Sequence, residues 1–433
     1  MSLSIHGEAA RLGGRFAAKG LGLAAQFGTL VLVTQALGAD GFAGYALLLS
    51  VASIAAQLAD FGLGRSLFRP AHRGVPFALL ATRSLGFRLT TAALLLPAVL
   101  ACGRHAALPL VPLALAFAGT LLFHLAILNR QQQLLRGRIA AAMLSEATPA
   151  ILYWAGLLLW WALAGGLGLA PALWLYLLAN AAGLALSIVA ADGAEAWRAA
   201  LRAVLRRRPG RMLAESLLLA RRAGPVGIEL FVSVASFNLP VLLAATLGDG
   251  GADAQVALYQ RVLGLEVAIL SVTVAARLKR YYDDGLVRRV DLRPALGSGA
   301  LVFAINAGGL LLLAVLPGVG SVTLLTLAAG LRDQLWLLAS VTGLIAVYVH
   351  CSMAALGGDW LWQRCASGGC GLATTIVAAT LLARAGMAGL PMVLAASLAG
   401  QVVALALLLA ALARGGARLQ LPGVATPLRA GAH

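Results

Sequence analysis

Most of the arginines and lysines that lie between the long hydrophobic segments of this chain fall into every second connection. The connections after the second, fourth, sixth and eighth segments carry Arg65, Arg69, Arg73 and Arg83, then Arg130, Arg136 and Arg138, then Arg198, Arg202, Arg206, Arg207, Arg208, Arg211, Arg221 and Arg222, then Arg277, Lys279, Arg280, Arg288, Arg289 and Arg293. The intervening connections hold only Arg104, Arg332 and Arg384. Basic residues that flank membrane helices stay in the cytoplasm. The pattern therefore predicts a polytopic membrane protein with both termini in the cytoplasm.

The composition argues against nucleic-acid binding, which is the usual interpretation of a strong positive charge. The net charge is +17, which in a soluble chain would suggest a nucleic-acid partner. Here 61% of the residues are apolar, and the arginines border apolar runs too long for a soluble core. We therefore expect membrane lipids as partners and no nucleic acid. The four cysteines imply neither a disulfide framework nor a metal site, and no cofactor is expected.

The hydrophobic pattern predicts an all-α fold with about twelve transmembrane helices. Their predicted cores are 16–36, 41–61, 85–102, 109–128, 139–163, 171–191, 226–247, 256–277, 298–316, 333–356, 367–384 and 391–413. Prolines and glycines interrupt the apolar stretch 317–335, which is the least regular part of the pattern. The polar stretch 192–225 lacks glycine and proline from Ala194 to Arg208, which predicts an amphipathic helix on the cytoplasmic face.

This polar stretch divides the chain into two predicted six-helix lobes, 1–222 and 223–433. The halves carry a weak repeat: Val33-Thr-Gln-Ala-Leu-Gly38 corresponds to Leu243-Ala-Ala-Thr-Leu-Gly248, and a tyrosine (Tyr45 or Tyr259) opens the following helix in each half. Both halves begin in the cytoplasm, so a pseudo-twofold axis along the membrane normal would relate them. That symmetry predicts two lobes around a central cavity.

Two stretches near the beginning of the chain resemble a known family. They are Gln35-Ala-Leu-Gly-Ala-Asp-Gly-Phe-Ala-Gly-Tyr-Ala-Leu-Leu-Leu-Ser50 and Leu58-Ala-Asp-Phe-Gly-Leu-Gly-Arg-Ser-Leu-Phe-Arg69. Both are similar to the start of Wzx-type polysaccharide flippases, which belong to the superfamily that includes MATE drug exporters and the lipid II flippase. Ala43 departs from the family pattern, which usually has glycine beside the phenylalanine.

The resemblance implies a flippase of the bacterial inner membrane and not an enzyme. Such a protein moves undecaprenyl-pyrophosphate-linked oligosaccharide repeat units to the periplasmic leaflet by alternating access, for O-antigen or exopolysaccharide synthesis. Its implied partners are the lipid-linked oligosaccharide, a polysaccharide polymerase and a chain-length regulator. The run Asp60-Phe61-Gly62-Leu63 is similar to the polysaccharide branch of the superfamily and not to its drug exporters.

Ionisable and amide side chains at bilayer depth are costly, so each is a candidate functional residue. In the resembled family the first, second, seventh and eighth helices line the cavity, and these helices hold most of such residues here. The predicted substrate-binding residues are Arg261, Lys19, Gln26, Gln57, Gln260, Asn238 and Arg65, and the predicted coupling or gating residues are Glu229, Glu266, Asp60 and Glu146. Arg88 is left out, because it falls in the first turn of its predicted span and would reach the headgroups.

Arg261 is the leading candidate for binding the pyrophosphate, since the planar guanidinium can hold phosphate oxygens bidentately. Its structural alternative is a salt bridge with Glu266. Lys19 and Glu229 both fall about one turn inside the cytoplasmic end of a predicted span, which suggests an ion pair that closes the cytoplasmic side. The alternative for Lys19 is a side chain that extends to the interface, and for Arg65 a charge that only orients the chain.

Two other functions stay open at this point. A MATE-like antiporter of cationic drugs would need an acidic cavity, and the mixed charges at bilayer depth do not exclude one. A membrane-embedded polysaccharide polymerase or ligase usually has one large external loop, whereas the outer loops here are short. The chain has no Gly-x-x-x-x-Gly-Lys-Ser/Thr phosphate-binding loop, which argues against ATP hydrolysis.

The predicted orientation can be tested by cysteine labelling. Cysteines introduced at 62–84, 129–138, 192–225, 278–297 and 357–366, or at either terminus, should escape a membrane-impermeant thiol reagent added to intact cells. These segments lie on the cytoplasmic side if the basic connections orient the chain. Labelling within 192–225 would overturn the orientation.

Overall fold

The computed structural model describes residues 2–67, 70–71, 73–247, 254–264, 267, 289–315, 327, 331, 333–357, 360–415 and 418–420. Apart from two three-residue parallel strands, β1 (Arg289–Asp291) and β2 (Arg418–Gln420), the regular structure in these residues is helical. The prediction of an all-α fold is therefore confirmed.

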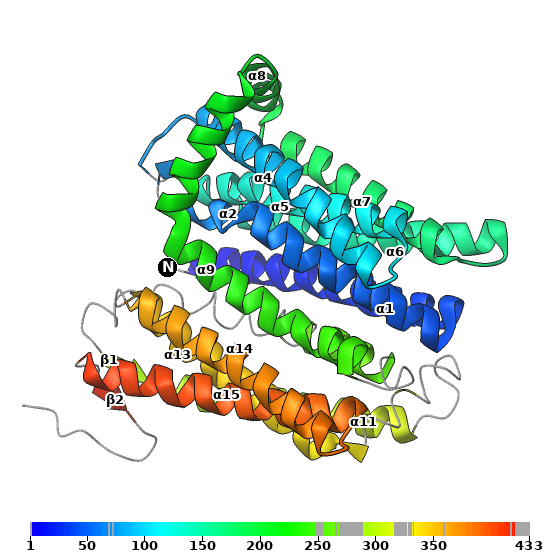
Figure 1. Ribbon diagram of the computed structural model, residues 1–433. Coiled ribbons are helices and arrows are strands. Elements are labelled where there is room, and N and C mark those ends of the chain that lie inside the picture. Colours follow the sequence, from blue (N-terminus) through cyan, green and yellow to red (C-terminus); the bar gives the residue numbers. More distant parts are fainter. Residues whose placement is uncertain are drawn as a thin grey trace, which may run out of the picture. The chain divides into compact units, whose positions relative to one another are not determined.

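The contacts divide the chain into two compact units. The first unit, Met1–Leu265 with Leu316–Gly330, contains helices α1 (Ser2–Asp60), α2 (Leu63–Ser66), α4 (Phe77–His105), α5 (Leu110–Leu135), α6 (Ile139–Ala164), α7 (Leu169–Ala190), α8 (Ala194–Leu205), α9 (Pro209–Leu247) and a helix at 254–264 (Figure 1). The second unit, Glu266–Val315 with Leu331–His433, contains α11 (Arg293–Val315), α13 (Leu335–Gly357), α14 (Leu361–Arg384) and α15 (Gly389–Arg414). The lobes predicted at 1–222 and 223–433 stay a prediction.

Within the described residues, nine helices are long and apolar enough to cross a membrane, and the chain is a multi-pass membrane protein. Helix α1 contains the first two predicted spans, α4 to α7 match the next four, α9 contains the seventh, and α11 and α13 to α15 match the last four. Of the predicted eighth span, only 256–264 and 267 are described. Most of the irregular stretch 317–335 lies outside the described residues.

Helix α1 is 59 residues long, although roughly 20 residues suffice to cross a bilayer. The chain changes direction at Gly38, where φ is 70° and ψ is −174°. Glycine adopts a positive φ at little cost, because it has no Cβ. The Leu37-Gly38 pair therefore ends the first predicted span, and the second begins almost at once.

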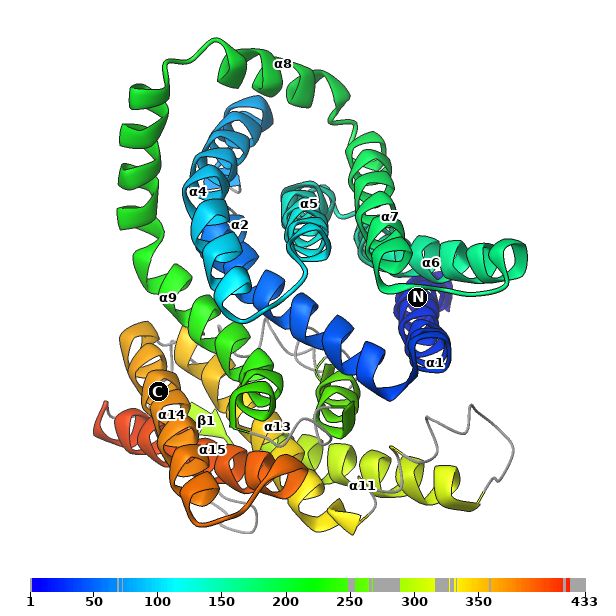
Figure 2. The ribbon, with the colours of Figure 1, turned by 45° about the vertical axis from the view of Figure 1, so that its right-hand side comes forward.

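Helix α5 lies at the centre of the first unit, packed against α1, α4, α6 and α7 (Figure 2). Glycines make several of the close approaches. Gly28 of α1 faces the indole of Trp154, and a Cβ added there would overlap the Nε1 atom of that ring. Gly183 of α7 faces Pro149 in the same way, and its added Cβ would lie 2.5 Å from Cγ. Because lipid tails remove the hydrophobic drive between helices, such close packing supplies much of their attraction.

Glycines also allow close helix packing in the second unit. Helix α13 packs against α11 and α15, and α14 packs along α15. Gly371 of α14 meets Gly400 of α15, where a Cβ added to Gly400 would lie 2.6 Å from the Gly371 carbonyl oxygen. The two helices can approach this closely only because both positions are small.

The predicted amphipathic helix is α8. Trp197, Ala200 and Val204 form its buried face, and the helix packs against α4. The indole N–H of Trp197 donates a hydrogen bond to Asn129 Oδ1 at 2.7 Å, and Asn129 Nδ2 donates to Ser187 Oγ at 2.9 Å. Its arginines lie on the exposed face. The helix is confirmed, and its contact with lipid stays a prediction.

The Asp60-Phe61-Gly62-Leu63 run has a structural role. Helix α1 ends at Asp60, and Phe61 and Gly62 take positive φ values of 43° and 68° before α2 begins. Gly62 lies directly against α9, where a Cβ on it would be 2.9 Å from the Cα of Gly227. The glycine thus serves both a left-handed turn and a backbone-to-backbone contact.

This double role predicts that Gly62→Ala is more damaging than an ordinary glycine replacement. A left-handed alanine costs about 1–2 kcal/mol, and overpacking typically adds about 1–3 kcal/mol. Gly137→Ala is the matched control, because Gly137 has a φ of 72° but nothing within 4 Å of its added Cβ. Thermal unfolding in detergent should show a clearly larger fall in Tm for Gly62→Ala. Equal falls would mean that the contact with Gly227 contributes nothing.

Candidate functional site

A buried amide cluster joins three helices of the first unit. Gln260, on helix 254–264, donates a hydrogen bond through Nε2 to Asn238 Oδ1 of α9 at 2.7 Å. The same nitrogen lies 3.1 Å from Ser50 Oγ of α1. All three side chains are buried. The structure therefore brings together the predicted residues Gln260 and Asn238 and adds Ser50.

Arg261 follows Gln260 in the chain, and its guanidinium lies over an aromatic ring. Its Cζ is 5.7 Å from the centroid of Tyr45, a cation–π arrangement. Its Nη2 is buried and has no hydrogen-bond partner among the described residues. A buried guanidinium nitrogen left without a partner is costly. The site therefore holds donor capacity that a bound anion or water would satisfy.

Tyrosines on neighbouring helices hold Tyr45 in place. Its hydroxyl lies 3.1 Å from that of Tyr153 on α6, and the Tyr153 ring meets Tyr176 of α7 edge-on at 5.6 Å. The Tyr176 hydroxyl in turn lies 3.2 Å from Thr120 Oγ1 of α5. The sequence marks Tyr45 through its motif, but no spacing identifies Tyr153 or Tyr176 as its neighbours.

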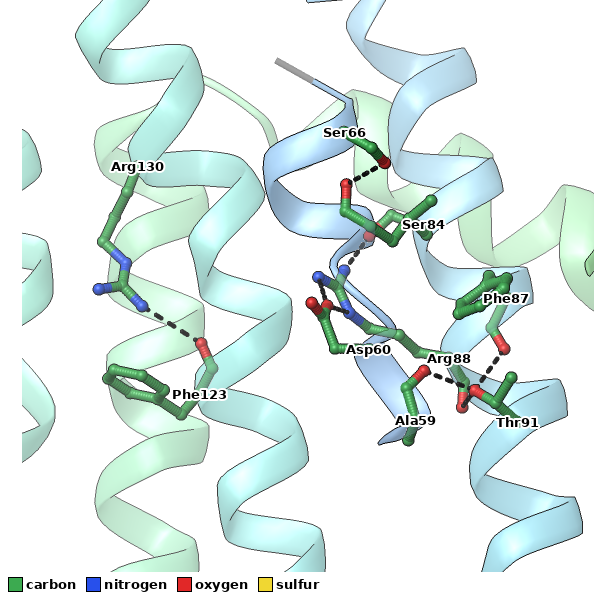
Figure 3. Close-up of polar contacts among 10 residues, drawn as sticks. Ala59, Asp60, Ser66, Ser84, Phe87, Arg88, Thr91, Phe123 and Arg130 are labelled. Atoms are coloured by element: carbon green, nitrogen blue, oxygen red, sulfur yellow. Dashed lines mark hydrogen bonds and ion pairs between the residues drawn. The ribbon is translucent and has the colours of Figure 1, made fainter. Parts of the chain in front are cut away.

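Asp60 is sealed in a pair with Arg88, as Figure 3 shows. Arg88 Nε donates to Asp60 Oδ1 at 2.7 Å, and its other nitrogens contact Asp60 and Ser84. The exposed fractions of the Arg88 and Asp60 side chains are 0% and 3%. The prediction that Arg88 reaches the headgroups is wrong, because α4 begins at Phe77 and places Arg88 about three turns inside the helix.

Lys19 and Glu146, predicted separately, form a salt bridge with 2.8 Å between Nζ and Oε1. The predicted partner of Lys19 is Glu229, and that pairing is wrong in this structure. The reason is that α6 packs along the first half of α1, a neighbour relation that the sequence does not reveal. Glu229 is buried on α9 and accepts a hydrogen bond from Ser233 Oγ at 3.2 Å.

The remaining predicted residues are placed as follows. Gln57 is buried on α1, and its Nε2 has no hydrogen-bond partner among the described residues. Gln26 is exposed on α1, seven residues after Lys19 and therefore on the same helix face. Arg65 belongs to α2, but its side chain lies outside the described part of the chain, as does the whole of Glu266. Within the described ranges, no group of three or more His, Cys, Asp or Glu side chains could hold a metal.

The sealed pair predicts a strong asymmetry between single and double replacements. Arg88→Met leaves Asp60 buried without its partner, which costs about 3–5 kcal/mol. The double variant Arg88→Met with Asp60→Leu removes both charges and should recover most of that loss. Yield and Tm of the purified protein measure both effects. A double variant no more stable than Arg88→Met alone would contradict this account of the pair.

No protein-family model matches the chain, and no curated protein matches its sequence. Solved structures do match it over nearly its whole length. An inward-facing multidrug resistance MATE family transporter of the MOP superfamily shares 16% identity at a TM-score of 0.61, covering 93% of this chain and 95% of its own. The MATE multidrug transporter DinF-BH shares 17% identity at a TM-score of 0.61, covering 93% of this chain and 94% of its own.

The lipid II flippase MurJ, in an inward closed conformation, matches with 11% identity and a TM-score of 0.60, covering 94% of this chain and 87% of its own. Identities this low establish shared architecture and no more. The chain thus has the fold that MATE-type transporters and the MurJ flippase share.

Proposed function

We propose that the protein is a flippase for polyprenyl-pyrophosphate-linked oligosaccharides in the bacterial inner membrane. It carries the repeat unit from the cytoplasmic to the periplasmic leaflet by alternating access, and it serves polysaccharide synthesis together with a polymerase and a chain-length regulator. Both termini lie in the cytoplasm under this proposal. The shared fold with MurJ and the sequence motif support it.

The observation that carries the proposal is the buried Nη2 of Arg261, which has no hydrogen-bond partner among the residues that the structure describes. A pyrophosphate has to cross the hydrocarbon layer, where the bare anion is very unfavourable. A guanidinium fixed over Tyr45 offers its N–H groups without prior rearrangement. The hydrogen bonds of Gln260 fix the helix turn that bears Arg261, so the cation is held in a defined place.

The charges of the first unit favour an anionic substrate over a cationic one. A site for cationic drugs needs carboxylates free to meet them. Asp60 is sealed against Arg88, Glu146 is bound to Lys19, and the carboxylate of Glu229 is buried. Arg261, in contrast, keeps a donor nitrogen without a partner in the described part of the chain.

The connections also argue against a polymerase or ligase. Three of the turns predicted to face the periplasm are only four residues long: 106–109, 165–168 and 385–388. None of these three turns has room for the large external loop typical of those enzymes. A protein that only moves its substrate needs no catalytic domain there.

Replacement of Arg261 tests the proposal. Arg261→Ala should slow translocation of a fluorescent polyprenyl-pyrophosphate disaccharide in proteoliposomes by roughly ten- to a hundredfold, the worth of a charge-assisted hydrogen bond. Arg261→Lys keeps the charge and should recover part of the rate, and the exposed Arg202→Ala is the control that should change nothing. The measured quantity is the rate at which the probe reaches the opposite leaflet.

Two outcomes would reject the proposal. One is a wild-type rate from a well-folded Arg261→Ala. The other is wild-type protein that moves a lipophilic cationic dye but not the pyrophosphate probe, which would favour a drug exporter.

A further inference from the structure

A second charged cluster lies in the first unit, apart from Arg261. It joins Lys19 of α1, Arg130 of α5 and Glu146 of α6. One oxygen of Glu146 lies 2.8 Å from Lys19 Nζ, and the other lies 3.9 Å from Arg130 Nη1. The second distance is too long for a hydrogen bond. One carboxylate therefore serves two cations, and one of the two is incompletely neutralised.

Arg130 keeps unused donor capacity although its head is held in place. Its Cζ lies 4.6 Å from the centroid of the Phe123 ring, and Nη2 donates to the Phe123 carbonyl oxygen at a long 3.4 Å (Figure 3). Its Nε is buried and has no hydrogen-bond partner in the described part of the chain. A guanidinium has five N–H donors, so this group can accept a further oxygen ligand without moving far.

The cluster is accessible, unlike the pair of Asp60 and Arg88. The side chains of Lys19, Arg130 and Glu146 are 15%, 12% and 36% exposed. The carboxylate, which is the most exposed member, can leave without unpacking the helices. An incoming anion with two charges would compete well against a single carboxylate at such a site.

The position of the cluster fits an entrance. Arg130 lies in the last two turns of α5 and Glu146 in the second turn of α6, so both lie at the α5–α6 end of the unit. The basic connections predict that this end faces the cytoplasm. Tyr45, which supports Arg261, contacts Tyr153 of α6, whereas Lys19 contacts Glu146 of the same helix. Tyr153 follows Glu146 by about two helical turns, so the two cationic sites lie at different levels along α6.

We propose that Lys19 and Arg130 form a loading site for a lipid-borne pyrophosphate, and that Glu146 is the resident counter-anion that the ligand displaces. Glu146 neutralises the cations while the site is empty and releases them when substrate arrives. It also prevents the site from holding the anion too tightly to pass it on. The ligand's identity rests on the flippase function proposed above, whereas the displacement mechanism rests on the cluster itself.

The test uses the full-length protein in neutral phosphatidylcholine nanodiscs, with farnesyl pyrophosphate as probe and farnesol as the uncharged comparison. Glu146→Gln frees both cations and should tighten binding of the pyrophosphate by roughly two- to fivefold, the effect of a partly exposed ion pair. Lys19→Gln and Arg130→Gln should each weaken it by a similar factor. Arg136→Gln, at the same end of α5 but paired with Asp192, is the matched control and should leave it unchanged.

If the cluster only holds the three helices together, Glu146→Gln should not raise the affinity for pyrophosphate. In that case Glu146→Gln lowers Tm and leaves pyrophosphate affinity unchanged or weaker, which overturns the proposal. If Glu146→Gln proves too unstable, Glu146→Asp keeps the charge but shortens its reach, and it should give a smaller gain in affinity. No gain from either variant rejects a displaceable counter-anion.

Two further measurements distinguish a lipid headgroup from the substrate pyrophosphate, and the loading site from Arg261. Inorganic pyrophosphate should compete strongly with farnesyl pyrophosphate, and phosphatidylglycerol should compete only weakly. Equally strong competition by phosphatidylglycerol would make a lipid headgroup the ligand and reject substrate loading. In Arg261→Ala, the affinity gain from Glu146→Gln should persist although translocation fails. Loss of that gain would place all binding at Arg261 and remove the loading site, while leaving the flippase function standing.

Discussion

The unfavourable transfer of charge into hydrocarbon is the constraint on which this structure depends. An isolated ion deep in a membrane protein has to be paired, bound or moved towards water. The described part of the first unit shows three ways in which such cations are accommodated. Arg88 is sealed against Asp60, and Lys19 and Arg130 share a partly exposed carboxylate. Arg261 lies over an aromatic ring, and one of its nitrogens has no partner among the described residues. The three sites differ in how completely their cations are neutralised, from the sealed Arg88 to Arg261. The proposed function follows from Arg261, whose charge is the least compensated.

The Tyr45 ring explains how the Arg261 guanidinium can be buried without a neutralising carboxylate among the described residues. The face of a tyrosine ring attracts a guanidinium without consuming its N–H groups. A carboxylate in the place of Tyr45 would have neutralised Arg261 and filled its donors. The hydroxyl contact to Tyr153 fixes the ring, and the Tyr176 edge fixes Tyr153, so the orientation of one cation depends on three helices.

The sequence predicts the fold well because both main signals are local. Span length and the placement of arginine along the chain identify the helices and the linker helix α8.

The candidate site is predicted only in part, because its contacts are between helices. Gln260, Asn238 and Arg261 are predicted from their depth and from the helices that line the cavity in the resembled family, whereas the sequence marks Tyr45 only through its motif and gives no signal for Tyr153 or Tyr176. The apolar core at 85–102 misplaces Arg88, because α4 begins eight residues earlier and the polar run Thr82-Arg83-Ser84 inside the helix hides that start. The partner of Glu146 is equally hidden, since the order in which helices pack is not written in a local pattern.

The sealed pair has an evolutionary consequence. Losing Asp60 strands Arg88, and losing Arg88 strands Asp60, so neither single change is tolerated easily. Descent through either intermediate is slow, and the two positions are expected to change together or not at all. Across related chains, this would appear as correlated substitution between the end of α1 and the middle of α4. A pair of positions 28 apart in sequence would thus record an interior contact that no single chain reveals.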